Sequence, residues 1–85
     1  MIHELKTWPE YFKDVAAGIK TFELRKNDRD FQVGDELVLK EYDPKEDKYS
    51  GRYRTVLVMN VFRGDGTWGL MEGYCIMDIA LNDDE

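Results

Sequence analysis

Two kinds of hydrophobic periodicity divide this chain of 85 residues, and the helical kind comes near the start. Apolar side chains recur there at positions i, i+3, i+4, i+7 and i+8, which lie on one face of a helix: Trp8, Tyr11, Phe12, Val15 and Ala16. Thr7 and Glu10 have the spacing of a capping box, Pro9 suits the first turn, and Gly18 suits the helix end. We assign the whole stripe to the core, with ligand stacking by its first two aromatic residues as the alternative.

Alternating apolar and polar positions predict strands in the rest of the chain. The expected strands are residues 3–7, 21–25, 36–42, 52–63 and 74–81. In the second of these, Phe22 and Leu24 share one face and are expected in the core, whereas Glu23 and Arg25 share the other. Side chains expected to point inward in the later strands are Leu37, Leu39, Cys75, Met77, Ile79 and Leu81. Residues 43–51 are polar and predict a hairpin loop, and residues 64–69 predict a glycine-rich turn.

One helix and about five to six strands, joined mostly by tight turns, predict an α+β fold with a closed or strongly curved β-barrel. A small sheet avoids exposed edges by closing, and the segment 52–63 is long enough to bend and serve both halves. The length predicts a single domain over residues 1–85. Apolar residues make up 42% of the chain, which is enough for a core.

Composition excludes several classes of protein. No apolar run approaches the roughly 20 residues of a membrane span, and the first residues lack the apolar stretch of a signal peptide. Cys75 is the single cysteine, so we expect a buried small hydrophobe, no internal disulfide and a cytoplasmic location. His3 is the single histidine, so we expect no metal site and no other cofactor. Nothing in the pattern sets an oligomeric state.

The net charge of −6 argues against nonspecific binding to a phosphate backbone. Its distribution is uneven, because residues 1–34 hold six basic and six acidic side chains, whereas residues 35–85 hold six basic and twelve acidic ones. From residue 20 to residue 29 there are four basic and two acidic side chains. The chain can therefore present one mildly basic site on an acidic body.

The candidate ligand-binding residues gather in that basic stretch: Lys20, Glu23, Arg25, Asn27, Asp28 and Arg29. A carboxylate and a guanidinium two residues apart on one strand face lie roughly 7 Å apart at the backbone. Glu23 and Arg25 can therefore pair, or hold one ligand between them, and the amine of Lys20 can reach the same face. The Asn-Asp-Arg run is typical of a turn held by side-chain to backbone bonds, and we expect it to line the cleft as well. The alternative is that all six residues only brace the fold.

These residues also resemble a known signature. Gly18-x-Lys20-x-x-Glu23-x-Arg25, placed after a helix and entering a strand, resembles the signature of the ASCH domains, named for activating signal cointegrator homology, in the PUA-like superfamily. The wider pattern resembles a small bacterial and phage subfamily of uncharacterised ASCH-like proteins, through His3, Leu5-Lys6, Phe12, Lys26-Asn27-Asp28-Arg29, Phe31-x-Val33-Gly34-Asp35 and Glu41-Tyr42. The resemblance runs in motifs from His3 to about Tyr42, and it covers the remainder only as a strand pattern.

The resemblance implies a PUA-like barrel with a cleft beside the signature strand, which in the superfamily is proposed to hold RNA or a modified base. At least one related group hydrolyses acylated cytosine nucleosides with a lysine, a threonine and a glutamate. Lys20 matches that lysine, Glu23 stands in the place of the threonine, and Glu72 is the nearest candidate for the glutamate. Aromatic side chains available for stacking on a base are Tyr42, Tyr53 and Trp68.

We therefore expect a module that binds RNA or a nucleotide base through Lys20, Glu23 and Arg25, and we favour binding over catalysis. The first alternative is a small amidohydrolase for N4-acylated cytidine-like nucleosides, in which Lys20 and Glu23 would be catalytic. The second is a phage-type accessory protein that binds another protein through the acidic second half of the chain. A membrane is not among the expected partners.

Overall fold

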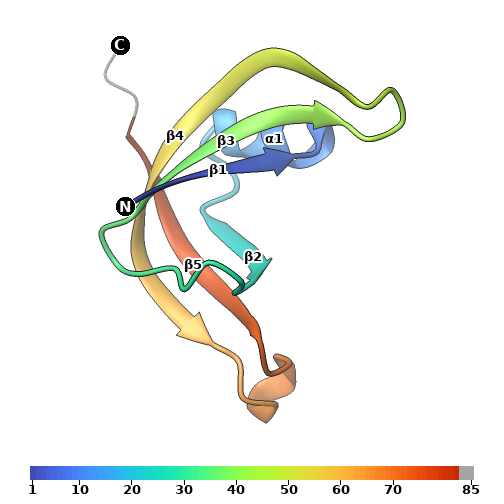
Figure 1. Cartoon of the computed structure of the whole chain (residues 1–85). Helices are drawn as coiled ribbons and strands as arrows, with labels where there is room; N and C mark the ends of the chain where they lie inside the picture. Colours follow the sequence, from blue (N-terminus) through green and yellow to red (C-terminus); the bar gives the residue numbers. More distant parts are fainter. Residues whose placement is uncertain (83–85) are drawn as a thin grey trace.

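The sheet of the computed structural model, which describes residues 1–82, has five strands and curves strongly into a half-barrel (Figure 1). Its elements in chain order are β1 (Ile2–Thr7), α1 (Pro9–Ala16), β2 (Phe22–Lys26), β3 (Glu36–Asp43), β4 (Lys48–Arg63), the 3₁₀-helix η1 (Thr67–Gly69) and β5 (Tyr74–Leu81). The polar loop expected at residues 43–51 is shorter than predicted, because both flanking strands extend into it and leave only residues 44–47 as a turn.

The strand order is β1-β3-β4-β5-β2, with β1 parallel to β3 and every other pair antiparallel. The long strand β4 pairs with β3 from Lys48 to Leu57 and with β5 from Val56 to Arg63. The register of β4 with β5 shifts between Val58 and Asn60, and such bulges bend a strand and increase its twist. The expectation that this strand serves both halves is thus confirmed. The sheet is strongly curved and does not close, because β1 and β2 remain its two edges.

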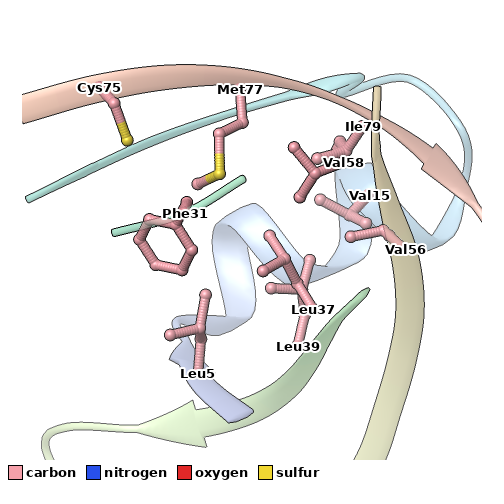
Figure 2. Close-up of a cluster of buried hydrophobic side chains, with 10 residues drawn as sticks. All are labelled: Leu5, Val15, Phe31, Leu37, Leu39, Val56, Val58, Cys75, Met77 and Ile79. Atoms are coloured by element: carbon pink, nitrogen blue, oxygen red, sulfur yellow. The ribbon is translucent and has the colours of Figure 1, made fainter. Parts of the chain in front are cut away.

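The core lies inside the curve of the sheet, where side chains from the strands, the helix and residue 31 meet (Figure 2). The inward positions predicted for Leu37, Leu39 and Met77 are confirmed, since all three are fully buried. Cys75 is fully buried as well, and burial raises the pKa of its thiol. Leu81 departs from the prediction: it is the last residue of β5 and is about half exposed, although Val56, with which it pairs, is fully buried.

The helix is confirmed, but only part of its apolar stripe is buried. Phe12 and Val15 enter the core, whereas Trp8 and Tyr11 remain about half exposed. Trp8 is the N-cap residue and has an extended backbone, so the predicted capping box is wrong: no side chain caps the helix. Thr7 instead ends β1 with its side chain buried.

Gly18 ends the helix as predicted. Its φ is 76°, in the left-handed region that glycine adopts readily. The N–H of Gly18 donates to the carbonyl of Val15 and the N–H of Ile19 donates to that of Asp14, which together form a Schellman motif. This motif turns the chain sharply into the segment that carries Lys20.

Gly18→Ala should lower the free energy of unfolding by about 1 kcal/mol, because a residue with a Cβ is strained in the left-handed region. A Cβ at this position would meet no other atom within 4 Å, so the loss reflects backbone conformation alone. Urea denaturation measures the change. Gly18→Asn should recover part of the loss, since Asn tolerates this conformation better, and an alanine variant as stable as the wild type would contradict the assignment.

A buried carboxylate holds the turn that leads into β3. Asp35 accepts hydrogen bonds from the ring of His3 at 2.9 Å, from the backbone N–H of Gln32 at 3.0 Å and from the Met1 amino group at 3.2 Å. Burial disfavours the charged form, but these hydrogen bonds outweigh it, and the pKa of Asp35 falls below its ordinary value of 3.8. The His3 ring also packs edge-to-face on Phe31. His3 therefore has a structural partner in the fold.

Asp35→Asn should lower the free energy of unfolding by about 1–2 kcal/mol at pH 7, since it weakens several hydrogen bonds to a buried group. Because the folded-state pKa is depressed, the carboxylate contributes stability above the unfolded value of 3.8 and loses it as the pH falls through the folded value. Urea denaturation of both proteins from pH 7 to pH 3 should show a difference that shrinks below about pH 4. A difference that stays constant over this range would contradict the role of Asp35.

Candidate functional site

The face of strand β2 that points into the core is not the predicted one. The register pairs Glu23 with Met77 and Arg25 with Cys75, and residues directly opposite each other share a face of the sheet. Since Met77 and Cys75 point into the core, the side chains of Glu23 and Arg25 also point inward. Glu23 is only 4% exposed, whereas Phe22 is 47% exposed, so the expectation that Phe22 and Leu24 enter the core is wrong.

The buried carboxylate of Glu23 is held by two cations. Lys20 Nζ donates to Glu23 Oε1 at 2.9 Å, and Arg25 Nη2 donates to Glu23 Oε2 at 3.2 Å. Lys20 also donates to the carbonyl of Phe22 at 2.6 Å and lies 4.7 Å from the centre of the Phe22 ring. A buried charge is tolerated only when it is paired in this way. The three charged groups are therefore fixed relative to one another before any ligand arrives.

The same three charged residues line a cavity of about 490 Å³, which we call the aromatic cavity. Its lining comes from the end of β1, the start of α1 and β2: Lys6, Thr7, Trp8, Tyr11, Lys20, Phe22, Glu23, Leu24 and Arg25. The buried groups Thr7 and Glu23 form its floor, and half-exposed aromatic rings form its rim. The cavity borders β2, an edge strand, and side chains from both faces of that strand line it. A volume of this size matches sites for small molecules.

Three aromatic residues line this cavity: Trp8, Tyr11 and Phe22. Ligand stacking was the alternative prediction for Trp8 and Tyr11, whereas Phe22 was not predicted to line a cavity. All three had been assigned to the core on the strength of periodicity. Tyr11 lies at the margin of the helical stripe and Trp8 precedes the first helical residue, which are the positions where an apolar stripe most often leaves the core. The side chains proposed for stacking, Tyr42, Tyr53 and Trp68, do not line this cavity.

A second cavity of about 430 Å³ adjoins the first, and we call it the basic cavity. It is lined by five cationic side chains, two carboxylates, two aromatic rings and a leucine: Lys6, Arg25, Lys26, Arg29, Lys40, Glu4, Asp28, Phe31, Tyr49 and Leu5. The two cavities share Lys6 and Arg25, so they are neighbours across the gap between the edge strands. Asp28 and Arg29 therefore belong to the basic cavity and not to the aromatic one.

Two arginines span the gap between the edge strands. Arg25 Nη2 donates to the Lys6 carbonyl at 3.0 Å and to Thr7 Oγ1 at 3.4 Å, while Arg29 Nη1 donates to the Glu4 carbonyl at 3.0 Å. Carbonyl groups on the free side of an edge strand have no strand partner. The two arginine side chains thus donate hydrogen bonds to β1 carbonyl groups on the open side of the half-barrel, where no strand pairs with β1.

Asn27 has a structural part. Its side-chain oxygen accepts from the backbone N–H of Phe31 at 3.0 Å, and its own N–H donates to the Gly73 carbonyl at 2.7 Å. It lines neither cavity. Of the Asn-Asp-Arg run, Asn27 therefore holds the turn, as expected, and Asp28 and Arg29 line a cavity. Ligand binding by these residues stays a prediction.

Other polar residues of the described chain line neither cavity, although Glu41 pairs with Thr7 in the register of β1 with β3. Glu41 is buried and accepts from Ser50 Oγ at 2.7 Å and from Arg52 Nε at 2.9 Å, which fastens the end of the β3–β4 hairpin. Glu72 is exposed and lines neither cavity. Within residues 1–82, no group of three or more His, Cys, Asp or Glu side chains could hold a metal ion, and no helix is both long and apolar enough to cross a membrane.

Fold and site together define a small α+β half-barrel with an aromatic and charged cleft along its open edges. The chain belongs to the family described as a domain of unknown function (DUF3850), whose model matches residues 2–79. It is 46% identical over 41 residues to an uncharacterised 12.9 kDa protein of Escherichia phage P2. The aligned part is 48% of this chain and only 38% of the phage protein.

Among solved structures, the crystal structure of the hypothetical protein PH0355 has a similar fold, with a TM-score of 0.66 over 96% of this chain and 100% of that one. The sequence identity is 16%, so the likeness concerns the fold alone. The expected relationship to uncharacterised phage proteins is confirmed by the match to the phage P2 protein, whereas the finer resemblance to ASCH domains stays a prediction.

Proposed function

We propose that this protein is a PUA-like, ASCH-type module that binds a nucleobase, free or in RNA, in the aromatic cavity. The single observation that carries the proposal is the composition of that cavity. Its lining combines half-exposed aromatic rings with fixed hydrogen-bonding groups, which is the combination that base recognition in single-stranded nucleic acid uses.

The charged groups can read the edge of a base. All three hydrogen bonds that Arg25 makes with Lys6, Thr7 and Glu23 start from Nη2, so the Nε and Nη1 donors of its planar fork are not engaged in them. Glu23 offers acceptor oxygens to an exocyclic amine, and carboxylates commonly accept from such groups. Because these residues already hold one another, little side-chain entropy remains to be lost when a ligand binds.

The rings supply the stacking surface. Trp8 and Tyr11 come from the start of α1, and Phe22 comes from β2 on the other side of the cavity. Lys20 holds the Phe22 ring through a cation–π contact. Stacking of one base on an aromatic side chain contributes about 1–3 kcal/mol. Millimolar binding needs about 4 kcal/mol, so the hydrogen bonds from the charged groups must add to the stacking.

The test is a fluorescence titration with the four ribonucleosides and a short single-stranded RNA. A Trp68→Phe background leaves Trp8 as the single tryptophan. At least one ligand should change the Trp8 emission saturably, and Phe22→Ala should weaken that binding about 5- to 150-fold. Tyr53→Ala removes a similarly exposed aromatic ring that lines neither cavity, and it should have no effect. No response to any ligand, or equal losses in both variants, would reject the proposal.

One observation favours hydrolysis as the second candidate function: the amine of Lys20 and the carboxylate of Glu23 lie 2.9 Å apart in the wall of the cavity. Hydrolysis of an acylated base would require Lys20 to give up a proton, whereas binding requires none. Incubation with N4-acetylcytidine, followed by chromatography for cytidine, separates the two. Release of cytidine that disappears in Lys20→Ala would establish hydrolysis, and binding without release would exclude it for this substrate.

A further inference from the structure

We infer that the basic cavity is a phosphate site, so that the two cavities together take a nucleotide unit: the base in one and its phosphate in the other. The inference deepens the proposed function and rests on it. It names the ligand class as a nucleotide, free or within a single strand of RNA, and not a nucleoside.

The first support is the charge that remains after internal pairing. Lys40 Nζ lies 2.9 Å from Glu4 Oε1, which neutralises one of the two carboxylates in the lining. Arg25 is shared with the buried carboxylate of Glu23. The lining cations beyond these ion pairs are Lys6, Lys26 and Arg29, and the cavity has a single further carboxylate, that of Asp28. The ammonium of Lys6 also lies 4.4 Å from the centre of the Tyr42 ring.

The second support is the contrast between this cavity and the rest of the molecule. The whole chain carries a net charge of −6, so its surface repels anions in general. A cavity with a surplus of positive charge on such a body is a local exception. Lys26 is exposed, and its ammonium can meet a phosphate as a point charge, while Arg29 adds a planar fork of donors.

The third support is continuity. Lys6 and Arg25 line both cavities, so the two cavities are adjacent, and the Arg25 side chain that bridges to β1 lies between them. A ligand suited to both needs an aromatic ring and an anionic group joined by a short connection. Nucleotides have this form, whereas an acidic peptide offers the charge without a stacking base, and a nucleoside offers the base without the charge.

The experiment compares each of the four ribonucleosides with its 5′- and 3′-monophosphates, again through Trp8 emission in the Trp68→Phe background. A charge-assisted phosphate contact should make one monophosphate bind at least about tenfold more tightly than its nucleoside at low salt. The advantage should fall with salt, with a slope of log K against log salt near about −0.7 per phosphate contact. Binding of the nucleoside should depend little on salt.

Lys26→Gln should remove most of the phosphate advantage, because Lys26 lines only the basic cavity. Lys45→Gln is the charge-matched control, since Lys45 lies in the turn after β3 and lines neither cavity. A trinucleotide that binds more tightly than the best monophosphate would assign the phosphate to an RNA strand. Equal affinities would assign it to a free nucleotide.

The outcomes separate the inference from the base-binding proposal. If nucleosides bind and a phosphate adds nothing, the phosphate site is rejected and base binding stands. If monophosphates and inorganic phosphate bind in a Lys26-dependent way while nucleosides do not, the phosphate site stands and base binding is rejected. If neither nucleosides nor nucleotides bind, both are rejected.

Discussion

Glu23→Gln is expected to lower the free energy of unfolding by about 3 kcal/mol, which is the lower end of the range for breaking a buried ion pair. The carboxylate is almost fully buried, whereas the side chains of Lys20 and Arg25 keep 16% and 26% of their exposure, so some water still reaches the cations. An amide has the same shape but only one acceptor oxygen, and its NH₂ group would face a cation. The substitution should also abolish ligand binding in the aromatic cavity, because Lys20 and Arg25 would lose the group that orients them.

Urea denaturation measures this effect, and the midpoint should fall by about 1–3 M for a protein of this size. Glu4→Gln is the matched control. It breaks the Glu4–Lys40 pair, in which both side chains are well exposed, and surface pairs contribute less than about 1 kcal/mol. If the two variants lost the same stability, Glu23 would not be the buried centre of a charged cluster.

Phe31→Ala is expected to cost about 3–5 kcal/mol, as is usual for truncating a buried phenylalanine. Its ring is 1% exposed, lies within the core in Figure 2 and packs against His3. The backbone of the same residue accepts from Arg63 at 2.8 Å and donates to Asn27. Removing the ring leaves a cavity where the segment after β2 is anchored to the half-barrel.

Phe22→Ala is the matched control for Phe31→Ala, because it removes the same side chain from a half-exposed position in β2. It should cost less than about 1 kcal/mol of stability, yet weaken ligand binding strongly. Thermal and urea denaturation of both variants measure the first effect, and the Trp8 titration measures the second. A Phe22 variant as unstable as the Phe31 variant would show that the face of β2 has been assigned wrongly.

Much of the fold could be predicted from local pattern. The helix and its glycine stop, the inward positions of β3 and, apart from Leu81, of β5, the bent long strand and the strong curvature all follow from periodicity and turn chemistry. These features depend on residues near one another in the sequence. The predicted capping box failed although its spacing was right, since Thr7 was already used as the last residue of β1.

The candidate site could be predicted only in part. The clustering of Lys20, Glu23 and Arg25 near one cavity agrees with the charge pattern of the stretch. The sequence left open whether Trp8 and Tyr11 enter the core or stack on a ligand, because an apolar residue at helical spacing does either, depending on what covers it. Phe22 was wrongly assigned to the core. The side-chain amide of Asn27 is of a type that can hydrogen-bond a base, but its oxygen already accepts a hydrogen bond from the backbone N–H of Phe31.

By itself, the sequence of this protein determined that Glu23 and Arg25 share one side of a strand and that Phe22 and Leu24 share the other, because alternation along a strand is a local property. Which side faces the core was decided by the tertiary structure, through the register that places Glu23 opposite Met77 and Arg25 opposite Cys75. That register depends on pairing between segments about fifty residues apart, which no local pattern encodes. The same pairing leaves β2 as an edge strand, and so opens the cleft in which the charged and aromatic side chains meet.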